Sequence, residues 1–173
     1  MGFTNNTSKR PLLIIFCGLP GSGKTTIARK LERETSAVRF STDEWMADLG
    51  VDFFDEMREN LQLRPNELWK ELLGHRQSII LEDGTWKREE RDTLRQVAKM
   101  LNAITEIHYF DLTFDELWRR LEIRNAIGAY GTVPITKELL QECWPRFQRP
   151  DKAELALFDR SIVYRSSREP SPR

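Results

Sequence analysis

Residues 18–25 have the residue types and spacing that most clearly indicate a chemistry. They read Gly-Leu-Pro-Gly-Ser-Gly-Lys-Thr and satisfy the pattern G-x-x-x-x-G-K-[ST]. Glycines let successive backbone N–H groups point inward around phosphate oxygens, and the following helix adds the positive end of its dipole. The residues predicted to bind the phosphates of a nucleotide are Gly18, Leu19, Pro20, Gly21, Ser22, Gly23, Lys24, Thr25 and Thr26.

Two side chains at the end of this loop have predicted roles. Lys24 supplies a positive charge for the β- and γ-phosphates, and the Thr25 hydroxyl is suited to ligate Mg²⁺. The alternative is an accidental glycine-rich turn. Against it, the apolar residues 12–17 predict a strand before the loop, and residues 25–35 have helical spacing after it. ATP and Mg²⁺ are therefore the predicted cofactors.

Carboxylates follow two further apolar runs. Asp43 comes after the predicted strand 38–41, where a kinase needs a group that orients an acceptor hydroxyl and takes its proton. The alternative, that this acid only caps the next helix, is equally open on geometry alone. Residues 78–81 end in Glu82 and Asp83, and we favour Asp83 as the metal-binding carboxylate over a merely solvated strand end.

Arg120 and Arg124 are the candidate basic residues of the site. They are four residues apart, so they share one helix face and both could meet the nucleotide. The glycine-rich residues 128–134 that follow could form a lid that excludes water from the transferring phosphoryl group. The alternative is a solvated helix end followed by a surface loop. We predict Lys24, Asp43, Arg120 and Arg124 as catalytic residues.

The elements that must position these groups alternate along the chain. We expect strands at 12–17, 38–41, 78–81, 104–112 and 161–164, with helices at 25–35, 43–63, 65–73, 87–101, 113–124 and from 136. Thr113 and Glu116 form a capping-box signature, and Pro65 is suited to the first turn of a helix. Alternation of this kind predicts an α/β fold: a mostly parallel sheet with helices on both faces and ligands at the carboxyl ends of its strands.

The size and composition of the chain exclude several classes of protein. We expect a single domain at residues 1–165, with a flexible start at 1–10 and a disordered tail at 166–173. Equal numbers of basic and acidic residues, 27 each, argue against binding a polyanion by bulk charge. Two cysteines, expected to be buried, and two histidines give little material for a disulfide framework, a zinc site or a histidine triad.

Missing signals narrow the class further. The polar start and the short apolar run after it predict neither a secretory signal nor a membrane span, so we expect a cytoplasmic protein. No Asn-Lys-x-Asp motif is present, which argues against a GTPase, and the chain is too small for an AAA+ motor with a helical domain. A compact, kinase-like enzyme remains.

The ordered motifs resemble those of the small P-loop kinases grouped with the AAA_33, zeta-toxin and polynucleotide-kinase-like proteins. The motifs are residues 18–25, 41–45, 81–85, Arg124-Asn125 and Val133-Pro134. The resemblance implies a P-loop NTPase fold of the nucleotide- and shikimate-kinase type, with a parallel five-stranded sheet and a small lid. It also implies ATP- and Mg²⁺-dependent phosphorylation of a hydroxyl group, with Asp43 as the acceptor-side base.

The departures from that pattern concern the acceptor. Thr42 and Met46 flank Asp43 where polynucleotide kinases have arginines, and Gly128 stands where their lid arginine is expected, so nucleic acid is disfavoured as acceptor. Residues 43–56 contain six acidic and no basic residues, which suits a cationic, amine-bearing small molecule with a hydroxyl group. A solvated acidic helix face is the alternative.

Other functions stay open at this point. Within the enzyme class they are a nucleotide-sugar kinase of zeta-toxin type and a polynucleotide 5'-hydroxyl kinase. From another class, the protein could be an ATP-binding regulatory switch. The predicted partners are ATP and a small-molecule acceptor, with no membrane partner and no prediction of oligomeric state.

Overall fold

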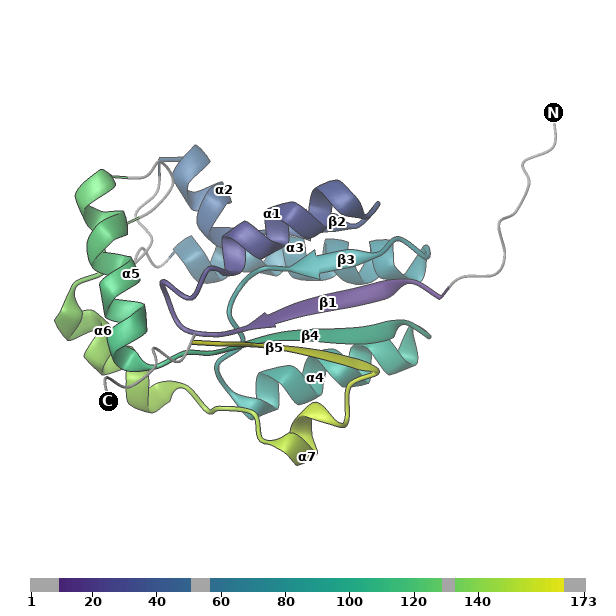
Figure 1. The fold of residues 1–173 in the computed structure, drawn as a ribbon. Helices are drawn as coiled ribbons and strands as arrows, with labels where there is room; N and C mark the ends of the chain where they lie inside the picture. Colours follow the sequence, from purple (N-terminus) through teal and green to yellow (C-terminus); the bar gives the residue numbers. More distant parts are fainter. Residues whose placement is uncertain (1–9, 51–56, 129–132, 167–173) are drawn as a thin grey trace.

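A computed structural model describes residues 10–50, 57–128 and 133–166 of the chain. Within these ranges strands and helices alternate, as the sequence predicted (Figure 1). In chain order the elements are β1 (Leu12–Cys17), α1 (Lys24–Glu34), β2 (Val38–Phe40), α2 (Thr42–Asp48), α3 (Met57–Gly74), β3 (Ile79–Leu81), α4 (Arg88–Met100), β4 (Ile104–Asp111), α5 (Phe114–Ile127), α6 (Lys137–Cys143), η1 (Trp144–Arg146), α7 (Lys152–Leu155) and β5 (Arg160–Arg165).

The five strands form one sheet in the order β2-β3-β1-β4-β5, and every neighbouring pair is parallel. The chain moves from β1 out to β2 and β3 on one side, then crosses to β4 and β5 on the other. The connections therefore reverse direction beside β1, and ligands of open parallel sheets bind outside the carboxyl ends of the strands at such a point. The predicted five-stranded parallel sheet is confirmed.

Helices cover both faces of the sheet because the strands are apolar on both sides. In β1, Leu13, Ile15 and Cys17 belong to a large buried cluster that includes side chains of α3, α4 and α5. Ile14 and Phe16 point to the opposite face, where Ala28 of α1 packs. Figure 1 shows α1 on one side of the sheet and α4 on the other, with α5 beside the carboxyl ends of the strands.

The region after β2 differs from the prediction. We expected one helix over 43–63 and a new one starting at Pro65, but α2 ends at Asp48 and Pro65 lies inside α3. A proline inside a helix removes one backbone hydrogen bond. Trp69 and Leu73, four residues apart on α3, are buried in the core, and this packing outweighs the local preference for a break. Residues 51–56, the end of the acidic segment, lie outside the described residues.

Capping residues define the later helices. Thr113 accepts a hydrogen bond from the Glu116 backbone N–H at 3.3 Å, as predicted. A full capping box would also have the Glu116 side chain accept from the Thr113 backbone N–H. The Glu116 carboxylate instead binds Arg119 and Arg120 of the next turn. The elements η1 and α7, of three and four residues, were not predicted, since they are too short to show a hydrophobic period.

The flexible start was predicted at residues 1–10 and the disordered tail at 166–173. Of these residues, the structure describes only Arg10 and Ser166. Arg10 is anchored: its guanidinium donates to the carbonyls of Asn102 and Ala103. No helix in the described part of the chain has the length and apolar character needed to cross a membrane.

Candidate active site

The glycine-rich loop follows β1 and leads directly into α1. Gly21 and Gly23 adopt left-handed conformations with φ of 78° and 95°, which favour glycine. Gly23 is the N-cap of α1, so the helix begins at Lys24, one residue earlier than predicted. Ser22 closes the turn by donating its N–H to the Leu19 carbonyl at 3.3 Å. The loop therefore has the backbone conformation that a phosphate cradle requires.

The predicted phosphate-binding side chains have different surroundings. Leu19 is buried in the core and anchors the loop, so only its backbone can contribute to a phosphate site. Thr25 and Thr26 are exposed in the first turn of α1. The Ser22 hydroxyl is buried and has no hydrogen-bond partner among the described residues. An unpartnered buried hydroxyl within the loop fits an anionic ligand, because it can donate to a phosphate oxygen.

Helix α5 packs tightly against the loop. A Cβ placed on Gly21 would lie 2.6 Å from Leu121 Cγ, so a side chain there would separate α5 from the loop. From the same helix, Arg120 Nη1 donates to the Ser22 carbonyl at 3.2 Å. The loop is thus supported by α5 through one apolar contact and one charged hydrogen bond.

Lys24 folds back along the loop that carries it. Its Nζ donates to the carbonyls of Gly18 and Leu19, each at 3.0 Å. Burial lowers the pKa of Lys24, and the carboxylates of Asp43, then Glu82 and Asp83, oppose that change. These acids come from α2 and from the end of β3, so the fold brings the predicted loop lysine and the predicted carboxylates together.

The end of β3 contacts the start of α2. Asp83 Oδ1 accepts from the Thr42 N–H at 3.1 Å, and Oδ2 accepts from the Thr42 hydroxyl. The preceding Glu82 is buried and forms an ion pair with Arg39. This arrangement supports our preference for Asp83 as the metal-facing acid, since Glu82 points to a permanent cation. It also gives Asp83 a second role, which is to anchor α2.

The residues present fit a magnesium–nucleotide complex. Mg²⁺ in phosphotransferases keeps several waters and takes few protein oxygens, because the substrate phosphates supply the rest. Thr25 offers an exposed hydroxyl, and Asp83 offers a carboxylate, an oxygen ligand of the kind that Mg²⁺ prefers. Among the described residues, no three or more His, Cys, Asp or Glu side chains form a cage for a metal ion.

The structure separates the two predicted arginines. Arg120 lies against the loop at Ser22 and is held at its Nε by Glu116, at 2.8 Å. Arg124, one turn later, donates from Nη2 to the Val133 carbonyl at 3.1 Å, and its buried Nε has no partner in the described ranges. Burial lowers the pKa of Arg124, and the charge of Asp43 opposes this. The charge of Arg124 therefore interacts with that of Asp43.

The described residues on both sides of the predicted lid are connected to α5. Gly128, with φ of 64°, ends the helix, and residues 129–132 lie outside the described residues. The chain returns at Val133 and Ile135, where Asn125 Nδ2 donates to the Ile135 carbonyl at 2.8 Å and Oδ1 accepts from its N–H. The motif parts Arg124-Asn125 and Val133-Pro134 are therefore joined by the hydrogen bond from Arg124 to Val133, and Asn125 holds the next residue but one, Ile135.

Gly84 is a site residue to which the sequence analysis gave no role. A Cβ at this position would lie 2.7 Å from the Gly18 carbonyl oxygen and 3.3 Å from Lys24 Cε. The loop after β3 therefore touches the glycine-rich loop directly. The available signal was its position after the acidic end of β3, but only the tertiary contact explains why glycine is needed.

We expect the substitution Gly84→Ala to weaken nucleotide binding and to destabilise the protein by about 1–3 kcal/mol, as overpacking typically does. The reason is that the Gly18 carbonyl is backbone and cannot move without displacing the phosphate loop. Gly74→Ala is the control, because a Cβ there would meet only Leu101 Cδ2, at an ordinary 3.9 Å. Isothermal titration with ADP and thermal unfolding check both; equal behaviour of the two variants contradicts the assignment.

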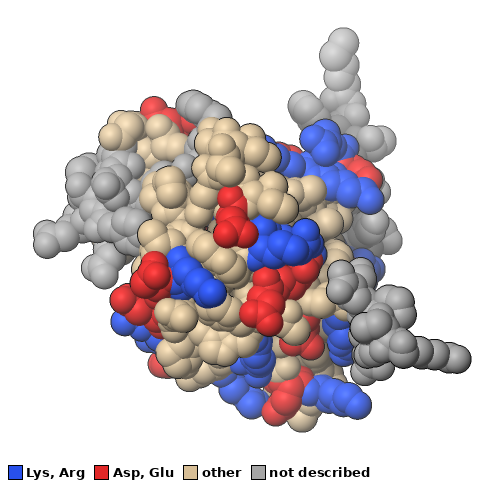
Figure 2. Space-filling model, turned by 60° about the vertical axis from the view of Figure 1, so that its left-hand side comes forward, with Lys and Arg blue, Asp and Glu red and all other residues tan. Residues whose placement is uncertain are grey.

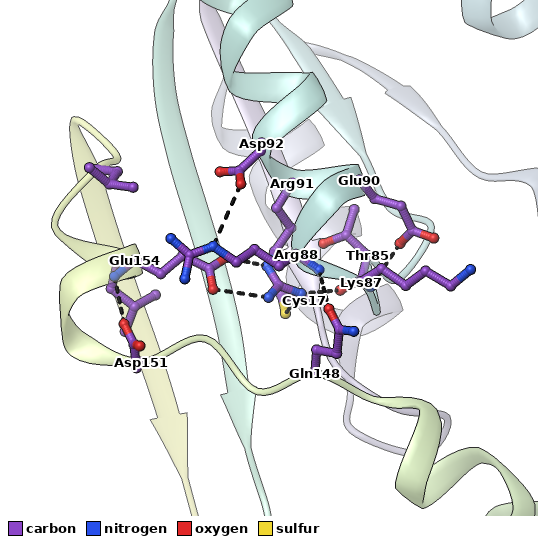
Figure 3. Close-up of polar contacts among 12 residues, drawn as sticks. Cys17, Thr85, Lys87, Arg88, Glu90, Arg91, Asp92, Gln148, Asp151 and Glu154 are labelled. Atoms are coloured by element: carbon purple, nitrogen blue, oxygen red, sulfur yellow. Dashed lines mark hydrogen bonds and ion pairs between the residues drawn. The ribbon is translucent and has the colours of Figure 1, made fainter.

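A fully buried ion pair lies behind the same loop and was also missed (Figure 3). Arg91 of α4 binds both carboxylate oxygens of Glu154 on α7, at 2.6 and 3.1 Å. Its Nη1 donates to the carbonyls of Thr85 and Trp86, each at 3.2 Å. Arg91 thereby connects α4, α7 and the segment that follows Gly84. Its partner is 63 residues away, so no local pattern could reveal it.

Both cysteines are buried, as predicted, and both are free thiols. Burial raises the pKa of Cys17 to about 11, against smaller opposing effects that begin with Arg91. Burial likewise raises the pKa of Cys143. Neither is activated as a thiolate nucleophile, since such cysteines have depressed pKa values.

The parallel five-stranded sheet, the phosphate loop after β1 and the acids at the ends of β2 and β3 together define a P-loop kinase fold. Residues 13–150 match the AAA_33 family, described as an AAA domain, and the chain belongs to that family. No curated protein matches the sequence.

Solved structures of kinases and of an RNA-repair complex share this fold. A gluconokinase from Sinorhizobium meliloti 1021 is similar over 94% of this chain and 86% of its own, with a TM-score of 0.61 and 18% identity. The APS kinase CysC of Mycobacterium tuberculosis, in complex with AMPPNP and APS, is similar over 90% of each chain, with a TM-score of 0.56 and 21% identity. A chain of the Pnkp1/Rnl/Hen1 RNA repair complex has a TM-score of 0.66 and 25% identity, over 84% of this chain and 46% of its own.

Proposed function

We propose that this protein is an ATP- and Mg²⁺-dependent phosphotransferase that phosphorylates a hydroxyl group of a small molecule. The observation that carries the proposal is the position of Asp43. Among the neighbouring acids, Asp43 most strongly raises the pKa of Lys24 and so favours its charged form. Asp43 also favours the charged form of Arg124. A carboxylate that interacts electrostatically with both a phosphate-loop lysine and a second cation suits transfer to a hydroxyl group.

Each group has a role in this proposal. The loop backbone and the Ser22 hydroxyl bind the phosphates, and Lys24 leaves the carbonyls of Gly18 and Leu19 to meet the β- and γ-phosphates. The Thr25 hydroxyl and the Asp83 carboxylate would hold Mg²⁺, which would supply positive charge to the phosphate oxygens when bound.

On the acceptor side, Asp43 orients the hydroxyl group and accepts its proton. Arg124 stabilises the negative charge on the transferring phosphoryl group. Arg120 positions the loop through the Ser22 carbonyl. The two arginines, equivalent in the sequence, thus receive different roles.

The charge of the surrounding surface bears on the acceptor. Figure 2 brings the side of the molecule with α5 and the strand ends forward, and its described part shows basic and acidic side chains interspersed among neutral ones. Proteins that hold the backbone of a nucleic acid present a continuous basic stripe. The mixed surface favours a small acceptor over a polynucleotide, and an amine-bearing acceptor would interact with the Asp43 carboxylate in the first turn of α2.

The test is ADP formation measured with a panel of acceptors: aminoglycosides, polyols and sugar acids, nucleosides, sugar nucleotides and 5'-hydroxyl oligonucleotides. We expect at least one small molecule to raise turnover well above the rate with water. A response only to oligonucleotides would favour a polynucleotide kinase, and a response only to sugar nucleotides would favour an enzyme of zeta-toxin type. If no acceptor but a protein partner raised turnover, the regulatory switch would replace the kinase.

We expect Lys24→Met to weaken ATP binding and to reduce transfer together, because a neutral side chain cannot meet the β- and γ-phosphates. Lys30→Met on the same helix is the matched control, since Lys30 is exposed and forms only a 3.8 Å surface pair with Glu34. ATP titration and the transfer rate measure both effects. A Lys24 variant that binds and transfers like the Lys30 variant would exclude the phosphate-loop assignment.

A further inference from the structure

Arg39, in the middle of β2, is at the centre of a charged network that the proposed mechanism does not use. Its Nη1 pairs with Glu82 at the end of β3, and its Nη2 pairs with Glu44 of α2. Its Nε binds Glu32 of α1 at 2.9 Å. All three nitrogens of one guanidinium therefore bind carboxylates, and these carboxylates come from three different elements.

The inner part of this network is largely removed from solvent. The side chains of Arg39 and Glu82 are 10% and 8% exposed, and that of Glu44 is 26% exposed, whereas Glu32 at the rim is 41% exposed. Solvent-exposed ion pairs such as that of Glu32 contribute little to stability, because water screens them and their side chains lose entropy. The bridge from Glu82 through Arg39 to Glu44 is the part that can fix geometry, because a planar guanidinium binds its partners in a set direction.

Hydrogen bonds shift the pKa values of Arg39 and Glu44 in opposite directions. Burial by itself lowers the pKa of Arg39, but its hydrogen bonds to Glu44, Glu32 and Glu82 outweigh this and raise it. Burial raises the pKa of Glu44, and its hydrogen bonds to Arg39 and Arg29 outweigh that and lower it. These hydrogen bonds therefore favour the charged forms of Arg39 and Glu44.

A second connection runs beside the first. Asp83, next to Glu82 on the same strand end, binds both the N–H and the hydroxyl of Thr42. The two consecutive residues that follow β3 thus hold the two residues of α2 that flank Asp43: Asp83 holds Thr42 directly, and Glu82 holds Glu44 through Arg39. Because α2 has only seven residues, it gains little rigidity from its own hydrogen bonds and depends on such anchors.

We propose that Arg39 is a positioning residue for phosphoryl transfer: by bridging Glu82 and Glu44 it fixes the first turn of α2, and with it the place of the Asp43 carboxylate relative to Lys24. This inference rests on the proposed function, in which Asp43 is the acceptor-side base. Arg39 itself contacts carboxylates only and acts through α2. Misplacing a reacting group by about 1 Å can cost about 10²-fold in rate.

The kinetic test compares Arg39→Met and Arg39→Lys with Arg33→Met, which removes an exposed arginine from α1. We expect both Arg39 variants to lower kcat by about 10- to 100-fold with the KM for ATP nearly unchanged, since the phosphate loop is not part of the bridge. Arg39→Lys keeps the charge but cannot form the fork, and it covers the case in which the methionine variant fails to fold. Glu44→Gln, which breaks the bridge at its other end, should act in the same direction.

A double-mutant comparison separates positioning from general destabilisation. In an Asp43→Asn background, Arg39→Lys is expected to have little further effect on kcat, because there is no longer a base to misplace. A full additional loss in that background would overturn the proposal, since Arg39 would then act independently of Asp43. Wild-type kcat in Arg39→Lys would also overturn it.

A measurement without catalysis tests the structural part by itself. Trp45 of α2 packs edge-on against Phe40 of β2, with ring centroids 5.6 Å apart. In protein labelled with 5-fluorotryptophan, the ¹⁹F resonance of Trp45, assigned through Trp45→Phe, should shift or broaden in Arg39→Lys and not in Arg33→Met. An unchanged resonance would overturn the inference. If the resonance changes while Asp43→Asn transfers at the normal rate, the proposed base has failed and the anchoring of α2 stands.

Discussion

Asp43→Asn is expected to reduce phosphoryl transfer by about 10²- to 10⁴-fold, the contribution that a positioned general base typically makes. Asparagine keeps the size of the side chain but can neither accept the proton of the acceptor hydroxyl nor support the charges of Lys24 and Arg124. Nucleotide affinity should be nearly unchanged, because the loop backbone that holds the phosphates is not altered. Single-turnover transfer and ADP titration measure the two effects separately.

Asp48→Asn is the matched control for this prediction. Asp48 is an exposed acid at the end of the same helix, so its replacement changes the net charge by the same amount without touching the proposed base. We expect transfer close to that of the wild type. If Asp43→Asn lost transfer and nucleotide affinity in parallel, or unfolded at a markedly lower temperature than the Asp48 variant, Asp43 would be a structural cap of α2.

Arg91→Met is expected to destabilise the protein by about 3–5 kcal/mol, because it leaves the charge of Glu154 buried without its partner. The two side chains are 0% and 3% exposed, so water cannot replace the lost contacts. The carbonyls of Thr85 and Trp86 would also lose a donor. For a domain of this size the midpoint of thermal unfolding should fall by roughly 10 °C.

Arg88→Met is the control for this loss. Arg88 lies on the same helix, but its side chain is 50% exposed and forms a long ion pair with Asp92, at 3.6 Å (Figure 3). Its removal should therefore shift the unfolding midpoint very little. The double variant Arg91→Met/Glu154→Leu should regain part of the stability, since no buried charge is left unpaired. A midpoint for Arg91→Met equal to that of Arg88→Met would contradict the assigned role.

The fold could be predicted largely from the sequence because its signals are local. Buried strands are short apolar runs, and Leu12–Cys17 and Ile79–Leu81 lie where such runs were found. The break predicted at Pro65 was wrong, because burial of Trp69 and Leu73, contacts distant in sequence, decided the length of α3. Short elements such as α7 have too few residues to show a period.

The candidate site likewise has one part that local sequence signals predicted and another that depends on distant contacts. The sequence by itself predicted the candidate phosphate loop at residues 18–25, since such a site is built from contiguous backbone whose conformation depends on its own glycines. It also determined which strand ends carry Asp43 and Asp83.

Only the tertiary structure decided which partners these residues have. Arg39 is 43 residues from Glu82, and Arg91 is 63 residues from Glu154, so neither pair leaves a pattern along the chain. The same holds for Arg120 and Arg124, which share a helix face but bind a loop carbonyl at Ser22 and a returning segment at Val133. Charged side chains reach several ångströms from the backbone, so the packing between elements distant in sequence determines which partners lie within their reach.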